Sequence, residues 1–270
     1  MNQATHPFDA AIVLEPQGEG RWQGHTSAAY ANMVGPFGGL TAAQALNAVL
    51  QHPDLLGEPV ALTVNFAAAL ADGPFTATAR PARTNRSTQH WVVEFAQQDE
   101  TVLTATAITA NRRRTWGADD EAMPTAPAPE TVERADISGR VVWFERYDMR
   151  FVHGFFPSAW DGTERDSLTR LWARDDPPRP LDFCSLTALS DVFFPRVWRR
   201  RATMVPIGTV AMTVYFHADT AQLQATGSGH LLAQARAQAF RNGYFDQTAQ
   251  LWNRAGELLA TTHQLVYYKE

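Results

Sequence analysis

The chain contains one long internal repeat, which constrains its fold more than any other feature. Leu40–Ala42 recurs as Leu186–Ala188, an offset of 146, and Val60–Phe66 aligns with Val210–Phe216, an offset of 150. Repeats of about 20–50 residues would indicate a solenoid. A repeat of half the chain instead indicates two copies of one domain-sized unit, packed about a pseudo-twofold axis.

Three positions are polar in the second copy and apolar in the first. At Leu103 and Leu259 the offset has drifted to 156, as expected for a duplication with loop insertions. With these offsets Asp191, Thr209 and Gln264 correspond to Ala45, Pro59 and Ile108. Two units of one fold would need similar core residues at these places, so the polarity of the second copy indicates function rather than structure.

Each copy is predicted to contain one buried helix followed by about four antiparallel strands. The glycine-rich turn at residues 35–39 leads into an apolar helix that continues to residue 50. The strands are rich in β-branched and aromatic residues and are separated by turn signals. They are expected at 61–66, 75–82, 89–97 and 101–110, and after a helix over 181–194 at 208–217, 231–240, 244–253 and 258–268.

The predicted architecture is therefore α+β, with each sheet covering its own long helix. The expected domains are residues 1–115 and 141–270, joined by a linker over 116–140 that is rich in proline and acidic residues. Residues 161–180, rich in charge and proline, are interpreted as an insertion. Joining the two units edge to edge into one continuous sheet would remove two exposed edges.

Composition excludes several classes of partner. The chain has 270 residues, 45% of them hydrophobic and 19% charged, and its net charge of −5 argues against nucleic acid. No apolar stretch is long enough to span a bilayer, and residues 1–9 lack a signal-peptide pattern, so we expect a cytoplasmic protein. Cys184 is the single cysteine, which excludes an internal disulfide and a cysteine metal cluster. It is interpreted as a buried hydrophobe rather than a nucleophile.

Each polar position also has a plain structural explanation. Asp191 interrupts an apolar helix, so it lies either at a solvent edge or in a site where it acts as a general base. Thr209 is on its own an ordinary strand residue. Gln264 shares one strand face with Thr262 and Val266, and on a covered strand its amide needs partners. The coincidence of the three carries more weight than any one of them.

Taken together, these segments resemble the acyl-CoA thioesterase II type of double-hotdog protein, within the wider thioesterase-like superfamily. The resemblance covers nearly the whole chain. Its matching segments are Gly38-Gly39-Leu40 before the first helix, Asp191 followed by Phe194-Pro195, Thr209 ahead of Tyr215-Phe216-His217, and the segment 259–264. It implies a double hotdog fold and hydrolysis of an acyl-CoA thioester to free acid and CoA.

The resemblance also implies roles for these residues. Asp191, Thr209 and Gln264 would hold a water molecule, with Asp191 taking its proton and the other two fixing its position. Backbone N–H groups at a helix start, either at Gly38-Gly39 or near Leu181, would stabilise the oxyanion. No cofactor or metal is required. Two alternatives stay open: a non-catalytic acyl-CoA or acyl-chain binding protein, and a hydratase-like enzyme with a histidine beside Asp191.

Several other residues are candidates for substrate contact. Among the histidines, His25 and His217 could contact substrate or be structural, and His263 is a third candidate for a hydratase pair with Asp191; no two histidines have metal-ligand spacing. The clusters Arg112–Arg114 and Arg199–Arg201 could bind the phosphates of CoA or be solvated. Trp143, Trp160, Trp172 and Trp198 could line an acyl tunnel or fill the core. Single hotdog units pair because a lone curved sheet leaves apolar surface and strand edges open. The duplication provides only the first such pairing within the chain, so we expect the chain to form a homodimer.

Overall fold

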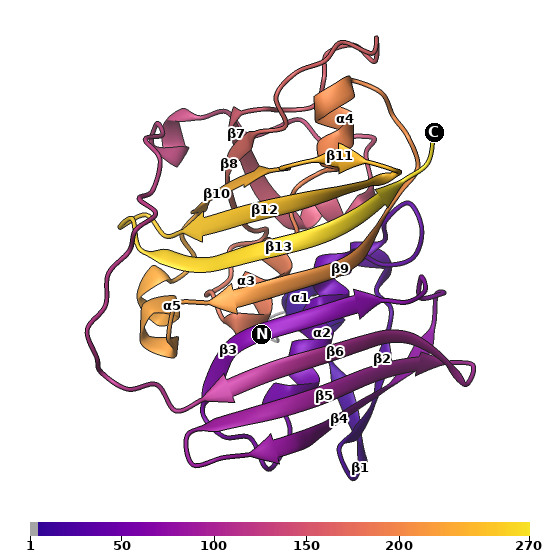
Figure 1. The fold of residues 1–270 in the computed structure, drawn as a ribbon, viewed down its shortest axis with the longest axis vertical. Helices are drawn as coiled ribbons and strands as arrows, with labels where there is room; N and C mark the ends of the chain where they lie inside the picture. Colours follow the sequence, from indigo (N-terminus) through magenta and orange to yellow (C-terminus); the bar gives the residue numbers. More distant parts are fainter. Residues whose placement is uncertain (1–4) are drawn as a thin grey trace.

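The computed structural model describes residues 5–270, and within them thirteen strands form one antiparallel sheet (Figure 1). The strand order is β1-β2-β4-β5-β6-β3-β9-β13-β12-β10-β8-β7, with β11 beside β12. The first half supplies β1 (Leu14–Gly18), β2 (Arg21–His25), β3 (Glu58–Phe66), β4 (Pro74–Thr84), β5 (Thr88–Gln97) and β6 (Glu100–Ala110). The second half supplies β7 (Tyr147–His153), β8 (Thr169–Asp175), β9 (Ile207–Phe216), β10 (Leu231–Arg236), β11 (Phe240–Arg241), β12 (Tyr244–Trp252) and β13 (Leu258–Tyr268).

The two halves meet at β3 and β9, where the repeat becomes a symmetry of the fold. Thr63 pairs with Thr213, which is the residue that the repeat alignment equates with it, and their hydroxyl oxygens are 3.0 Å apart. A residue faces its own counterpart in this way when a twofold axis passes through the pair. The predicted double hotdog with one continuous sheet is therefore confirmed.

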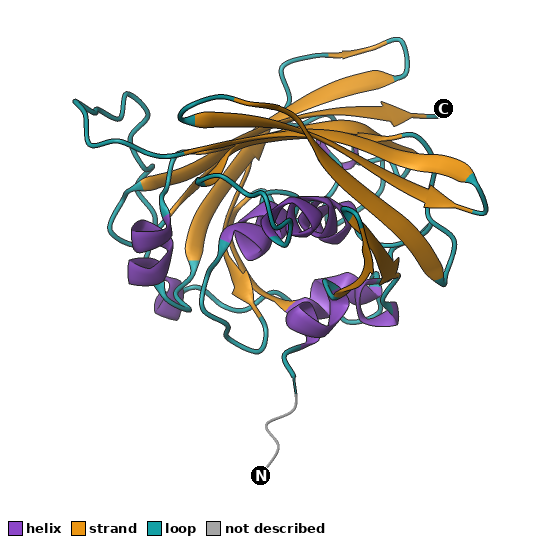
Figure 2. Ribbon diagram, turned by 90° about the horizontal axis from the view of Figure 1, so that it is seen from below, coloured by secondary structure: helices purple, strands orange, loops and turns teal. Residues whose placement is uncertain are grey.

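Two helices lie side by side in the concave face of the sheet, one from each copy (Figure 2). They are α2 (Gly38–Leu50) and α3 (Phe183–Leu189). The hydroxyls of Thr41 and Thr187, equivalent residues in the repeat, donate to the carbonyls of Phe37 and Phe183 at 3.3 and 2.7 Å. Gly39 allows the close approach of the helices, because a Cβ there would lie 2.7 Å from the carbonyl oxygen of Ala188.

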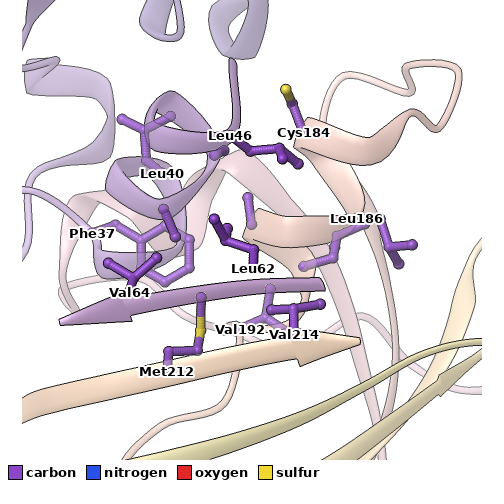
Figure 3. Packing of buried hydrophobic residues seen from close by; sticks show 14 of the residues in the cluster. Phe37, Leu40, Leu46, Leu62, Val64, Cys184, Leu186, Val192, Met212 and Val214 are labelled. Atoms are coloured by element: carbon purple, nitrogen blue, oxygen red, sulfur yellow. The ribbon is translucent and has the colours of Figure 1, made fainter. Parts of the chain in front are cut away.

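The core fills the space between these helices and the central strands. Figure 3 shows Leu40 and Leu46 of α2 and Leu186 of α3 packed over Leu62 and Val214 of β3 and β9. All five side chains are fully buried. The remaining helices are the α-helices α1 (Pro7–Ala11), α4 (Arg196–Arg201) and α5 (Thr220–Thr226) and the 3₁₀ turns η1 (Ala28–Tyr30), η2 (Pro129–Thr131) and η3 (Val142–Arg146).

The structure differs from the sequence-based expectation at several elements. The outer hairpins β1–β2 and β7–β8 were not expected, and β8 lies inside the segment 161–180 that was interpreted as an insertion. Helix α3 ends at Leu189, so the second helix is shorter than the expected 181–194, and Asp191 lies in the turn that follows it. The carboxylate is accommodated there because it accepts hydrogen bonds from the side chain of Gln264 and from the backbone N–H of Gly39.

The sheet register corrects one pair of equivalent residues. Met212 pairs with Gln264 in the second half, and its counterpart Leu62 pairs with Ala107 in the first. The counterpart of Gln264 is therefore Ala107 and not Ile108. Since alanine is also apolar, the contrast between the two copies is unchanged.

The segment rich in proline and acid runs along the outside of the second unit (Figure 1). The indole N–H of Trp172 donates to the carbonyl of Pro127 at 2.9 Å, and that of Trp252 to the carbonyl of Glu121 at 3.4 Å. These two hydrogen bonds attach the linker to the second unit, although its extended backbone is not part of the sheet. Within residues 5–270, no helix combines the length and apolar character needed to cross a membrane.

Candidate active site

The carboxylate of Asp191 lies where three elements meet. It follows α3 in the chain, it faces the first turn of α2, and it accepts a hydrogen bond of 2.7 Å from Nε2 of Gln264 on β13. Its Oδ2 lies so close to Gly38 that a Cβ there would be 3.0 Å away. The backbone N–H of Gly39 forms a second hydrogen bond to the carboxylate. The sequence-predicted residues Asp191, Gln264, Gly38 and Gly39 are thus brought together.

Burial makes Asp191 suitable as a base near neutral pH. Removal of the carboxylate from bulk water raises its pKa from 3.8 to about 7, while the hydrogen bonds from Gln264 and Gly39 act in the opposite direction. The part of the side chain that is still accessible faces a cavity. A general base works best when its pKa lies near the pH of operation.

A β-bulge turns Thr209 toward the same cavity. In the pairing of β9 with β13, Leu265 opposes Ala211 and Val266 opposes Thr209, so Val210 is the extra residue. One extra residue reverses the alternation of side chains, and Thr209 therefore faces the interior as Met212 does. The first half has the equivalent bulge at Val60, beside Pro59. Both copies therefore share the bulge, but only the second has a hydroxyl-bearing residue next to it.

Two cavities meet at Asp191. One, of about 230 Å³, lies under the second unit and has a mainly apolar wall. Its aromatic side chains are Phe37, Trp143, Phe144, Phe156, Phe193, Phe194, Trp198 and Phe245. The other, of about 320 Å³, lies at the seam between the two units and includes Phe66, Leu103 and Tyr267. Asn32, Met33, Asp191, Ile207 and Thr209 line both.

The register of the sheet explains why the first of these cavities, which we call the aromatic cavity, lies under the second unit. Trp91 pairs with Ala107, and Gln247 pairs with Gln264, so Trp91 and Gln247 are equivalent. Trp91 is fully buried and fills this space in the first unit, where its indole N–H donates to Thr109 at 3.1 Å. The smaller Gln247 leaves room. Sequence analysis missed Gln247, although the offset of 156 would have set it against Trp91.

The histidines considered as candidates lie elsewhere. His217 is at the far end of β9 from Thr209 and its ring is 3.1 Å from the hydroxyl of Thr261. His263 faces the outer side of the sheet beside Asp246, 3.2 Å away. His25 ends β2 and lines neither cavity at Asp191. The structure therefore does not bring His217 to the predicted substrate site, and it gives a hydratase-like pair no support.

Four of the six clustered arginines are engaged in the scaffold. Arg199 donates to the carbonyl of Leu168 at 2.9 Å, while Arg200 and Arg201 form ion pairs with Glu164 and Glu270. Arg112 donates to the carbonyl of Phe216, at the end of β9 that is remote from Thr209. None of Arg112–Arg114 and Arg199–Arg201 lines either cavity at Asp191.

The remaining candidates divide between core and cavity. Trp143 and Trp198 line the aromatic cavity, while Trp172 holds the linker and Trp160 is partly exposed. Cys184 is buried, and burial raises the pKa of its thiol, as expected for a small core residue. Within residues 5–270, no group of three or more histidine, cysteine or acidic side chains is arranged to hold a metal ion.

Two family models match the chain, one in each half. The model of the acyl-CoA thioesterase N-terminal domain matches residues 27–110, and that of the C-terminal domain matches residues 119–268. The chain belongs to the acyl-CoA thioesterase family. None of the curated proteins matches the sequence.

Solved structures share the fold of this thioesterase-family chain. A hot dog protein of unknown function from Alicyclobacillus acidocaldarius is 48% identical over 99% of both chains, with a TM-score of 0.94. A putative thioesterase II from Thermobifida fusca is 20% identical over 97% of both chains, with a TM-score of 0.81. The acyl-CoA thioesterase II TesB2 from Mycobacterium marinum is 18% identical over 97% of this chain and 98% of its own, with a TM-score of 0.76.

Proposed function

We propose that the chain hydrolyses acyl-CoA thioesters with a water molecule that Asp191 activates. The observation that carries this proposal is the Asp191 carboxylate, bonded to Gln264 at 2.7 Å, at the junction of two cavities. A thioester has two arms, and each cavity can take one. The acyl group would occupy the aromatic cavity, the pantetheine arm of CoA the seam cavity, and the reacting carbon the junction.

The reaction needs a base, a positioned water and a site for the oxyanion. Asp191 takes a proton from water, whose oxygen bonds to the thioester carbon to form a tetrahedral intermediate. Thr209 and the amide oxygen of Gln264 orient the water. When the carbon–sulfur bond breaks, the thiolate leaves and takes the proton from Asp191, so that free acid and CoA are formed and the carboxylate is restored.

The start of α2 is the better of the two predicted oxyanion sites. The first N–H groups of a helix have no partner within it, and Gly38 and Gly39, the first two residues of α2, lie beside Asp191 at the junction. Since the Gly39 N–H binds Asp191, Gly38 is the donor that we assign to the oxyanion. The start of α3, near Leu181, lies at the other end of that helix from Asp191.

A panel of acyl-CoA esters from short to long, with thiol release followed, tests the proposal. We expect release with at least one ester and saturation with its concentration. Saturable binding of every ester, measured by calorimetry, without thiol release from any of them, would show instead the non-catalytic acyl-CoA binding protein.

A further inference from the structure

Gln247 is a buried amide whose polar atoms face the aromatic cavity. Its side chain is only 3% exposed, and it points inward from β12 with Phe245 and Ala249 on the same face. No side-chain hydrogen bond joins it to any other residue in the part of the chain that the structure describes. Its amide atoms are not fully shielded, so they can form hydrogen bonds with a group that enters the cavity.

Several other side chains around this cavity already have partners. The indole N–H groups of Trp143 and Trp198 donate to Asn32 and to the carbonyl of Val205 at 3.3 and 2.8 Å. The guanidinium of Arg140 lies 3.7 Å from the centre of the Phe156 ring. Asp191, Thr209 and Gln264 serve the reaction under the proposed function. Among the amides that line this cavity, Gln264 donates to Asp191 and Asn32 accepts from Trp143, whereas Gln247 has no side-chain hydrogen bond among the described residues, so both ends of its amide are available to the acyl group.

The sheet register places Gln247 close to the reacting centre. Gln247 and Gln264 are directly opposed in the pairing of β12 with β13, so their Cβ atoms are about 5 Å apart. Gln264 on β13 donates to the Asp191 carboxylate, and Gln247 lies on the neighbouring strand β12, within the cavity proposed for the acyl group. A partner for its amide would therefore lie in the part of the acyl group nearest the thioester carbon.

The volume of the cavity indicates the size of the acyl group that it can enclose. A cavity of about 150 Å³ in an engineered protein holds benzene, with six non-hydrogen atoms. By proportion the aromatic cavity, at about 230 Å³, has room for roughly nine. A six-carbon acyl group with one more oxygen fits inside this volume, whereas a sixteen-carbon chain would extend outside it.

We propose that the aromatic cavity selects compact acyl groups that carry a hydroxyl or carbonyl oxygen on carbon 2 or 3, and that Gln247 is the residue that binds this oxygen. An amide can both donate and accept, so it suits either group. The proposal rests on the proposed thioesterase function and adds its substrate class. It also accounts for the exchange of Trp91 in the first unit for Gln247 in the second.

The test compares hexanoyl-CoA with 3-hydroxyhexanoyl-CoA, each enantiomer separately, in the wild type and in Gln247→Leu. We expect the wild type to prefer one hydroxylated ester in kcat/KM by about 2- to 13-fold, as for one neutral hydrogen bond. Gln247→Leu should abolish this preference, because kcat/KM for the preferred hydroxylated ester falls by more than kcat/KM for hexanoyl-CoA does. Gln250→Leu, the same substitution on the opposite face of β12, should leave the preference intact.

Two results would overturn the proposal. One is a wild type without preference between the esters, and the other is an equal loss on all esters in Gln247→Leu, which would show that Gln247 merely supports Gln264. If no acyl-CoA is hydrolysed at all, the proposed function fails separately. The affinities of the same esters, measured by calorimetry in the wild type and in Gln247→Leu, then decide the inference, and equal affinities would contradict it.

Discussion

Replacing Asp191 with asparagine should stabilise the protein, and the gain should grow with pH. In the folded protein the pKa of Asp191 is raised from 3.8 to about 7, so the folded state holds its proton more tightly than the unfolded state does. Well below pH 4 the carboxyl group of Asp191 is protonated in both the folded and the unfolded state, so it does not make the free energy of unfolding depend on pH. Stability is lost as the pH rises from about 4 through about 7, because the carboxylate must then ionise inside the protein.

The size of the effect follows from the two pKa values. At about 1.36 kcal/mol for each pH unit, the difference corresponds to about 4 kcal/mol. Water that enters the cavity screens the charge, so we expect a change on the order of 2–4 kcal/mol between pH 4 and pH 8.5. Asparagine has nearly the same shape and does not ionise, so it escapes this loss.

Denaturant unfolding of both proteins at pH 4, 5.5, 7 and 8.5 measures the difference in the free energy of unfolding. Asp246→Asn is the matched control, because Asp246 accepts backbone N–H bonds from Gln238 and Ala239, which help to hold its pKa below its usual value. That substitution should destabilise the protein at pH 8.5, with a smaller effect at pH 4. A difference between wild type and Asp191→Asn that does not change with pH would refute the reasoning.

Three further outcomes are expected. The value of kcat/KM should rise with pH and level off above about 7 as Asp191 ionises; a profile that is flat from pH 5 to pH 9 would argue against a carboxylate base. Thr209→Val and Gln264→Ala should each lower kcat by about 10- to 100-fold, which is less than the loss expected for Asp191→Asn. If steady-state kinetics show a larger loss of kcat in either variant than in Asp191→Asn, the assignment of base and positioning residues is reversed. The chain should form a homodimer, since β1 and β7 leave two sheet edges unpaired within residues 5–270; light scattering that gives the 29.9 kDa monomer at micromolar concentration would contradict this.

The central strands and the repeat could be predicted because their signals are local and strong. The strand expected at 258–268 has the same bounds as β13, and the shared face of Thr262, Gln264 and Val266 is confirmed by their burial. The strands β1, β2, β7 and β8 could not be found in this way. They are short, they lie next to charged or proline-rich sequence, and pairing with a neighbour rather than composition makes them strands.

The site was partly accessible to the same reasoning. Comparison of the two copies found Asp191, Thr209 and Gln264, since a polar residue in one copy opposite an apolar residue in the other is visible in the sequence. The bulge at Val210, which turns Thr209 inward, depends on register, and no residue type marks it. The place of Gln247 likewise follows from register and from the volume that Trp91 occupies in the first unit.

The most direct test of the proposed mechanism is the turnover of Asp191→Asn on an acyl-CoA that the wild type hydrolyses. Loss of the base should lower kcat by a factor on the order of 10²–10⁴, while the affinity for a non-hydrolysable acyl-CoA analogue changes little. Ala45→Asp, the equivalent position in the first copy, should not restore activity to this variant, because Pro59 and Ala107 offer no hydroxyl or amide to hold the water. Unchanged kcat in a folded Asp191→Asn protein would contradict the mechanism and return Asp191 to the status of a buried structural carboxylate.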